Sequence, residues 1–350
     1  MSLKNKIIWG IGGIIKIVKK NEWWEETRNF KKTVKEEYLD INETLAELEN
    51  NSSVIRLELN TIELPLFSKD PKRIKNQIKV YHFKTDKSSY LEIEAPANYS
   101  IPGEFEERVF IALTKIMKNN NYSRSFVVSA NEILETLVLS NKAYYKRIRE
   151  ALTLLSKTNY TFLNSLYSNK ESGIIEKKIM SNIMNITIIS KKDSRAKEIE
   201  AFEDGRIKEV YEINFTDYFY ENIIRKGYLA FDSGKLLAIE NSVSRAIYTI
   251  VEKWRGYDLY IKRQAFFIAR RIPLKWDKTQ IKRTIDTMEK ALIELRNLNL
   301  IKNYKIIKEK KWELAEIEIT YEESHNKTKR DTFFTEKNEF NSMDMLVTST

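Results

Sequence analysis

Two stretches of the chain, residues 104–189 and 240–321, are predicted to contain the same series of secondary-structure elements. In each, apolar residues at helical spacing predict a helix, a short helix and a longer helix. Alternating apolar residues then predict a β-hairpin. A series of elements that recurs once in 350 residues predicts two domains of the same fold.

Three helices followed by a hairpin are the elements of the winged-helix fold, in which the third helix enters the major groove of DNA and the hairpin, or wing, lies beside it. We therefore expect an α+β protein with two tandem winged-helix domains, an N-terminal helical extension and a disordered C-terminal tail. The expected boundaries are 1–53 for the apolar leader and helix, 54–200 for the first winged-helix domain with its N-terminal strand segment, 201–321 for the second, and 322–350 for the tail.

The same patterns locate the parts of each domain. In the first domain, the predicted third helix covers about residues 142–157 and the predicted wing covers residues 160–189. The charged segment 191–205 is predicted to be a linker or loop. In the second domain, the predicted second and third helices cover about residues 262–272 and 277–297, and the predicted wing covers residues 300–321.

Basic residues are concentrated in the predicted DNA-facing parts. The chain has 60 Lys and Arg against 50 Asp and Glu, a net charge of +10. In residues 253–283, basic residues far outnumber the two acids, Asp258 and Asp277. An excess of this kind indicates a polyanionic partner, here double-stranded DNA. The candidate DNA-binding residues are Lys142, Lys146, Arg147, Arg149, Lys262, Arg263, Lys278, Thr279, Gln280, Lys282, Arg283, Lys308, Lys310 and Lys311.

Side-chain chemistry suggests a role for each group of candidates. Gln, Lys and Arg can reach base edges, so we expect Gln280, Lys282 and Arg283 to read bases. We expect Lys278, Thr279, the wing lysines and the basic residues of the first domain to contact phosphates. For the first domain alone, a solvated basic helix face is an equally good interpretation.

The composition excludes several kinds of catalytic site. The chain has no cysteine, which excludes disulfides, thiolate metal sites and cysteine nucleophiles. Its only histidines are His82 and His325, and nine glycines leave little material for phosphate-binding loops. The tripeptide Glu176-Lys177-Lys178 matches a fragment of some nucleases but has no evident partner acid. We therefore expect no enzyme activity, no catalytic residue, no metal and no cofactor.

The N-terminus carries the apolar run Ile7–Ile15 between lysines, followed by a predicted helix from Glu22 to Asn50. The run is shorter than the roughly 17–25 residues of a membrane-spanning helix. Lysines follow it where a signal peptide needs small residues. We expect an unstructured leader, with membrane-surface anchoring by residues 7–20 as the alternative. The helix has a short heptad seam, which predicts docking on the protein's own body, with self-association as the second interpretation.

Four stretches of the chain match a family pattern. They are residues 57–67 (LELNTIELPLF), 101–113 (IPGEFEERVFIAL), 233–239 (SGKLLAI) and 244–248 (SRAIY). Together they resemble the plasmid replication initiator proteins of the replication initiator protein A family. The resemblance covers about residues 54–321, and the leader and helix of residues 7–50 are not part of the family pattern.

The resemblance implies a protein with two winged-helix domains that binds direct repeats (iterons) in a plasmid origin and promotes opening of an adjacent AT-rich segment. It also implies recruitment of host replication proteins, namely a helicase or helicase loader and the host initiator. A homodimer in equilibrium with a monomer, and a bacterial cytoplasmic location on the nucleoid or plasmid, are further implications. The alternative function is a winged-helix transcriptional repressor, including a repressor of its own promoter, because tandem winged helices serve both roles.

Overall fold

The computed structural model describes residues 53–333, except residues 85, 142, 194–198, 200–201, 203–204 and 309. All of these described residues belong to one compact unit, Ser53–Thr350. The predicted leader and helix of residues 7–50 lie outside the described residues, and so do residues 334–350 of the predicted tail.

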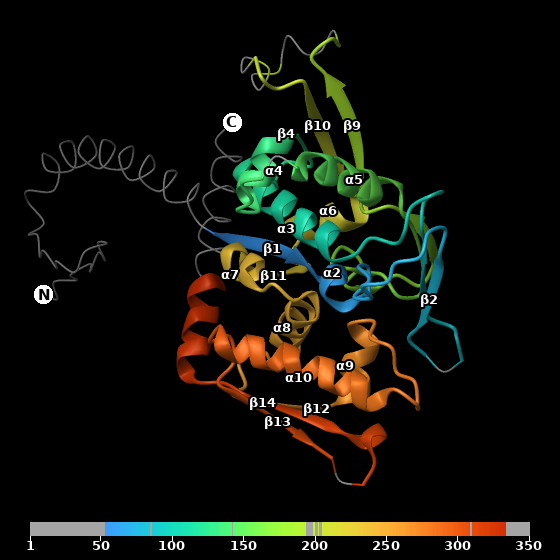
Figure 1. The fold of residues 1–350 in the computed structure, drawn as a ribbon, viewed down its shortest axis with the longest axis vertical. Helices are drawn as coiled ribbons and strands as arrows, with labels where there is room; N and C mark the ends of the chain where they lie inside the picture. The colour runs from blue at the N-terminus through green and yellow to red at the C-terminus, as the bar shows by residue number, and fades with distance from the viewer. Residues whose placement is uncertain are drawn as a thin grey trace, which may run out of the picture. The chain divides into compact units, whose positions relative to one another are not determined.

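The first winged-helix domain combines three helices with a three-stranded sheet (Figure 1). The helices are α3 (Glu104–Asn119), α4 (Ala130–Thr136) and α5 (Tyr144–Lys157). The strands are β4 (Ser125–Ser129), β9 (Met184–Ser190) and β10 (Glu209–Phe215), in the antiparallel order β4-β10-β9. The start of α3 carries three acidic residues, which suit the positive end of the helix dipole, and the Ser129 hydroxyl oxygen caps α4 by accepting the Glu132 N–H at 3.2 Å.

The wing of this domain is not the predicted one. The hairpin predicted within residues 160–189 does form, because residues 160–163 pair with 178–181, but these strands belong to a separate sheet and are not the wing. The segment 191–205 is predicted to be a linker or loop, and it is a loop between two paired strands rather than a linker between domains. Residues 191–208 instead connect β9 to β10, which pair from Glu209–Ser190 to Phe215–Met184. Alternating residues identify a strand but not every partner it pairs with, which is why the sequence assigned the wing to the wrong hairpin. The domain boundary near residue 200 stays a prediction, and the pairing of β10 with β4 and β9 runs across it.

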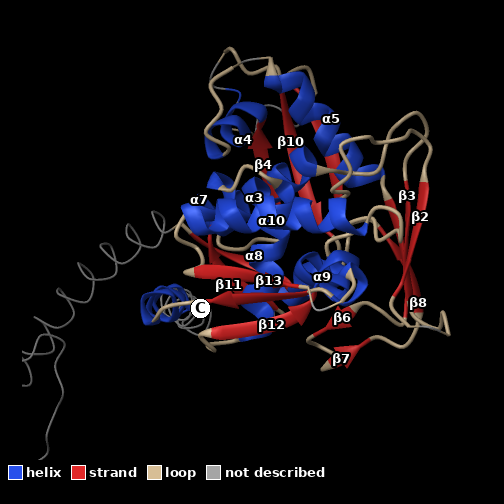
Figure 2. Ribbon diagram, turned by 60° about the horizontal axis from the view of Figure 1, so that its bottom comes forward, coloured by secondary structure: helices blue, strands red, loops and turns tan. Residues whose placement is uncertain are grey.

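A second sheet contains the strands that the sequence had assigned to the wing. It has the antiparallel order β2-β3-β5-β8, from β2 (Ile78–His82), β3 (Tyr90–Glu94), β5 (Asn159–Leu163) and β8 (Lys178–Ser181). One face buries alternate residues such as Ile93, Tyr160 and Phe162. The short hairpin of β6 (Tyr167–Ser168) and β7 (Gly173–Ile174) follows β5 along the chain (Figure 2).

The second winged-helix domain follows the predicted order of helices and wing. Its helices are α8 (Ser242–Arg255), α9 (Ala265–Arg271) and α10 (Ile281–Asn297). Its sheet has the order β12-β14-β13, from β12 (Tyr260–Gln264), β13 (Asn303–Ile307) and β14 (Glu316–Thr320), with a short 3-10 turn η3 (Trp312–Leu314) before β14. The predicted second helix is therefore too long at its start, because residues 260–264 pair with β14 as a strand.

The two domains are joined by structured elements. Strand β1 (Val54–Glu58) pairs with β11 (Tyr228–Asp232), and the helices α2 (Leu59–Glu63), α6 (Asp217–Ile224) and α7 (Ser233–Ala238) flank them (Figure 1). One hydrophobic cluster extends from Ile55 through both domains to Tyr321. The fold is thus an α+β fold with two tandem winged-helix domains that share a continuous core.

The chain continues past the predicted end of the second domain as a helix over residues 323–333. The prediction of a disordered tail is wrong for these residues. The Asn326 side chain accepts a hydrogen bond from Arg255 at 2.7 Å and donates to the Tyr257 carbonyl at 2.6 Å. Lys329 donates to the Glu252 carbonyl at 2.6 Å. The polar composition of this segment predicted disorder. That prediction fails because the polar side chains bind partners about seventy residues away in the sequence, which a local pattern does not reveal.

Candidate nucleic-acid interface

The start of α10 brings four exposed candidate residues together: Lys278, Gln280, Lys282 and Arg283. We call them the α10 basic surface. Lys278 and Gln280 lie in the turn before the helix, and Lys282 and Arg283 lie in its first turn. Among the residues that the structure describes, no acidic side chain forms an ion pair with Lys278, Lys282 or Arg283. Their charge is therefore available to an external anion.

The backbone at this helix start also favours an anion. The helix has 17 residues, and its N-cap residue Gln280 makes no side-chain cap hydrogen bond. The first N–H groups of a helix lack intrahelical partners and carry its positive dipole end, which attracts phosphate. The helix begins at Ile281 rather than at the predicted Asp277, because the Asp277 carboxylate accepts hydrogen bonds from the Thr279 N–H and hydroxyl, both at 2.9 Å. Thr279 is therefore already engaged within the turn.

The opposite face of α10 fixes its orientation. Ile281, Ile285, Met288, Leu292 and Leu295 are all buried, as their spacing predicted. The hydroxyl of Thr284 donates to the Lys275 carbonyl at 2.6 Å and anchors the preceding turn to the helix. The α10 basic surface consequently faces solvent.

The wing of the second domain carries the three predicted lysines near its tip. Lys308 places its ammonium 4.7 Å from the centroid of the Trp312 ring, a cation–π contact that restrains this side chain. Lys310 and Lys311 are exposed. The tip therefore has exposed positive charge on the β13–β14 hairpin, and β14 also pairs with β12.

Lys262 and Arg263 lie in β12 rather than in a helix, and Lys262 already has partners. Its ammonium lies 2.7 Å from a carboxylate oxygen of Glu316 and 3.6 Å from one of Glu318, both on the neighbouring strand. The hydrogen bond to Glu316 raises the pKa of Lys262. Arg263 donates to the backbone carbonyl of Lys262 at 2.9 Å and is exposed. The positive charge of Lys262 is therefore already neutralised within the sheet and is not free to bind an external anion.

Other basic residues of the run 253–283 form ion pairs with acidic residues of the protein itself. Lys253 and Arg271 both bind the carboxylate of Glu63. Arg255 is buried and binds Glu252 at 2.7 Å. These acids lie outside the run, so the local excess of charge in the sequence overstates the charge that is free at the surface.

The first domain places its candidates on the exposed side of α5. Lys146 lies 4.0 Å from Glu150, and Arg149 lies 3.7 Å from Glu209 at the start of β10. The Arg147 guanidinium lies 4.1 Å from the centroid of the Phe105 ring. Lys142 lies outside the described residues. Exposed ion pairs of this kind are weak, so these cations stay accessible to DNA. They differ from the cations of the α10 basic surface, which have no ion pair among the described residues.

Sequence reasoning missed the basic residues of the β9–β10 wing. Lys191, Lys192 and Lys208 are exposed near its tip, and the Lys191 N–H donates to the Lys208 carbonyl at 2.9 Å. These residues were hidden because the segment reads as a charged linker. The alternation of Tyr211, Ile213 and Phe215 after it predicts a strand, but it does not show that this strand pairs back with residues 184–190.

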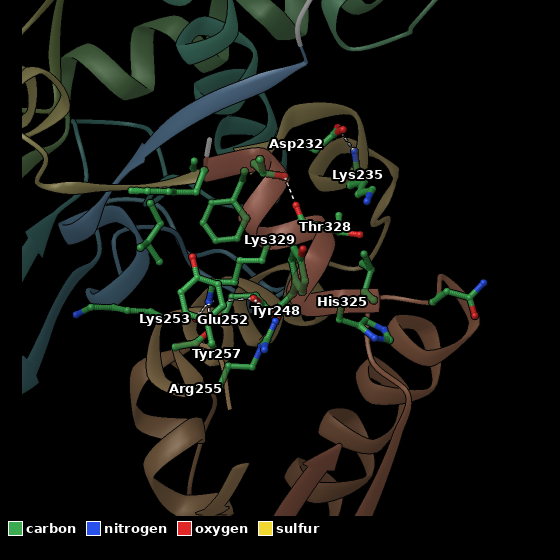
Figure 3. Close-up of a pocket in the computed structure, with 18 residues that line it drawn as sticks. Asp232, Lys235, Tyr248, Glu252, Lys253, Arg255, Tyr257, His325, Thr328 and Lys329 are labelled. Carbon is green, nitrogen blue, oxygen red and sulfur yellow. Dashed lines mark hydrogen bonds and ion pairs between the residues drawn. The ribbon is translucent and has the colours of Figure 1, made fainter. Parts of the chain in front are cut away.

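A pocket of about 290 Å³ lies away from these basic groups, between β11, α8 and the helix 323–333 (Figure 3). Leu229, Phe231 and Tyr248 contribute apolar walls. Three of its charged residues bind one another: Glu252 pairs with Arg255 and also with Lys329, at 3.3 Å. The pocket therefore offers packing space beneath a docked helix and no convergent set of free polar groups.

The described residues contain neither a metal site nor a membrane-spanning helix. Within them, no group of three or more His, Cys, Asp or Glu side chains could hold a metal ion. None of the helices in that part of the chain combines the length and apolar character that crossing a membrane requires. The alternative of membrane anchoring by residues 7–20 falls outside the described residues.

Comparison with known proteins adds the family. The sequence profile of the family described as "RPA: Replication initiator protein A" matches residues 56–261, more than half of the chain. None of the curated proteins matches the chain. Among solved structures, the chain is similar to domains 2 and 3 of RctB, with a TM-score of 0.48 at 14% identity over 75% of this chain and 98% of that chain. It is also similar to the Pi initiator protein in complex with iteron DNA, with a TM-score of 0.42 at 14% identity over 62% of this chain and 90% of that chain.

Proposed function

This chain belongs to the replication initiator protein A family, and we propose on that premise that it binds repeated duplex sites in its replication origin. The observation that carries the proposal is the α10 basic surface, where Lys278, Lys282 and Arg283 surround an uncapped helix start. A winged-helix domain inserts this part of its third helix into the major groove. Exposed cations and free N–H groups at that point fit the negatively charged duplex.

The side chains divide into those that read bases and those that hold the backbone. Gln280, Lys282 and Arg283 project from the helix start and reach base edges, where Arg and Lys recognise guanine and Gln recognises adenine. Lys278 and Thr279 contact phosphates. The exposed lysines of the second wing, Lys308, Lys310 and Lys311, hold the flanking backbone.

The first domain binds the neighbouring backbone. Lys146, Arg147 and Arg149 on α5 and Lys191, Lys192 and Lys208 on the β9–β10 wing supply its charge. Lys142, Lys262 and Arg263 remain part of the proposed DNA-binding set, with Lys262 released from Glu316 only when a phosphate competes for it. Two basic domains on one chain suit direct repeats better than a single short site.

The later steps follow from the family. The bound protein opens an adjacent AT-rich segment and recruits the host helicase or helicase loader and the host initiator. Monomers initiate, and homodimers in equilibrium with them repress. The chain acts in the bacterial cytoplasm on the plasmid or nucleoid, and it needs no cofactor, metal or covalent step of its own.

Footprinting on the chain's own replicon tests the proposal. The full chain is expected to protect direct repeats beside an AT-rich segment, and an Arg283→Gln variant is expected to lose this protection. Lys290→Gln is the matched control, because Lys290 lies exposed on the same helix outside the α10 basic surface. Protection of a promoter palindrome in place of repeats would favour the repressor, and no protected sequence at all would overturn the proposal.

A further inference from the structure

One carboxylate connects the second winged-helix domain to the segment that precedes the first. Glu63 is the last residue of α2. Its Oε1 accepts hydrogen bonds from Lys253 Nζ at 2.6 Å and from Trp254 Nε1 at 3.3 Å, both on α8. Its Oε2 lies 3.3 Å from the Arg271 guanidinium at the end of α9. Two helices of the second domain are therefore held by one side chain.

The end of α9 makes two more contacts outside its own domain. Arg270 donates a hydrogen bond to the backbone carbonyl of His82, the last residue of β2. The Arg271 guanidinium lies 5.3 Å from the centroid of the Phe83 ring and also donates to the Glu63 carbonyl at 3.3 Å. Two basic residues of the run 253–283 thus hold α9 against the four-stranded sheet and α2.

A buried ion pair joins the two first helices independently. Arg245 on α8 lies 3.0 Å from the Glu107 carboxylate on α3, and Lys69 binds the same carboxylate at 2.7 Å. The side chains of Arg245 and Lys69 are almost fully buried, so this contact is part of the continuous core. Glu63 differs, because its side chain is 19% exposed and lies at the rim of the junction.

We propose that Glu63 is a positioning residue that fixes the separation and rotation between α5 and α10. This rests on the proposed function, because it concerns the two DNA-binding helices. One inserted base pair moves the second contact by about 3.4 Å and rotates it by about 35° around the duplex. Two domains held in one arrangement cannot follow that change, so the protein accepts only sites with one spacing between its two contact segments.

The first test measures the junction without DNA. The chain contains no cysteine, so Lys157→Cys at the end of α5 and Lys290→Cys on α10 accept two spin labels with no background. In this labelled chain, pulsed electron–electron double resonance is expected to give a narrow distribution of distances between the two labels. Glu63→Gln is expected to broaden that distribution. Glu171→Gln makes the same chemical change at an exposed residue without an ion pair among the described residues and is expected to leave the distribution narrow. Equal widths in all three chains would overturn the inference.

The second test uses the protected site and versions of it with one, two or five base pairs inserted between its two contact segments. The unmodified chain is expected to bind the two-base-pair insertion about tenfold more weakly than the parent site. Glu63→Gln is expected to bind both within about threefold of each other. A Glu63→Gln chain that rejects the insertion as strongly as the unmodified chain would contradict the inference.

The two tests distinguish a failure of this inference from a failure of the proposed function. If the unmodified chain binds no repeat, the proposed function fails, and the distance distributions still decide the role of Glu63. A partly exposed ion pair contributes little to folding, so Glu63→Gln is expected to fold. Lys253→Gln removes the opposite side of the shortest contact, and it must broaden the distribution as well for the inference to stand.

Discussion

The carboxyl group of Glu58 makes the stability of this fold depend on pH. Glu58 lies in β1 and is fully buried. Its Oε1 accepts hydrogen bonds from the side-chain amides of Asn60 and Asn222, both at 2.6 Å, and its Oε2 accepts the Thr61 N–H at 3.0 Å. None of these donors carries a formal charge. Burial therefore dominates the hydrogen bonds and raises the pKa of Glu58 from 4.5 to about 7.

The direction of the effect follows from proton binding. Between pH 4.5 and about 7 the folded chain keeps a proton on Glu58 that the unfolded chain has released. This group therefore stabilises the fold fully below pH 4.5, and that contribution is lost as the pH rises through 7. At about 1.36 kcal/mol per pKa unit, the whole effect is about 3 kcal/mol. Between pH 5 and pH 8 the loss is about 2.5 kcal/mol.

Urea denaturation at pH 5, 6, 7 and 8 measures this loss. Glu58→Gln has no titrating group at this position. The free energy of unfolding of the unmodified chain minus that of Glu58→Gln is therefore expected to fall by about 2.5 kcal/mol across the range. Glu171→Gln, at an exposed position, should follow the unmodified chain in parallel. A difference between the unmodified chain and Glu58→Gln that stays constant with pH would refute the reasoning.

Four other substitutions separate recognition from folding. Arg283→Ala should weaken binding to the repeat by about 1–3 kcal/mol and relax its specificity, whereas Lys310→Ala should weaken all duplexes alike and reduce the salt slope by about one, as titrations at several salt concentrations would show. Val138→Asn should stabilise the fold by about 1 kcal/mol, because Val138 is 86% exposed with φ +56°, a conformation that β-branched residues avoid. Asn326→Ala should destabilise it by about 1–3 kcal/mol, because a buried hydrogen bond to Arg255 is lost.

Each of these predictions has a contrary outcome. Equal losses on all duplexes from Arg283→Ala and Lys310→Ala would mean that the reading helix is misplaced. A lower melting temperature for Val138→Asn would show that the valine side chain has a packing role. An unchanged free energy of unfolding for Asn326→Ala would mean that the helix 323–333 does not dock on α8 in solution.

The sequence predicted those elements whose evidence is local. The spacing of Ile281, Ile285, Met288 and Leu292 placed α10 and its buried face, because a helix repeats every 3.6 residues regardless of what it packs against. The repeated order of elements predicted the tandem winged helices in the same way. The family resemblance, which rested on residues outside α10, agrees with the matched profile.

The errors concern partners that are distant in the sequence. Strand β10 pairs with β9 across an irregular segment, so alternation alone could not assign the first wing. The charge of residues 253–283 was overestimated, because Lys253 finds its acid at Glu63, 190 residues earlier. The helix 323–333 looked unstructured because the partners of its polar side chains lie on α8 and just beyond it.

Position-specific crosslinking tests the central claim, that the start of α10 enters the duplex. Asp286→Cys places a single thiol on the exposed face of α10 beside the α10 basic surface, and Met180→Cys places one on β8, where the side chain is 65% exposed. Each is modified with a photoactivatable reagent and irradiated on replicon DNA. Crosslinks from position 286 to bases within the repeats, with none from position 180, are the predicted result. Equal crosslinking from both positions, or crosslinking from position 180 alone, would contradict the account.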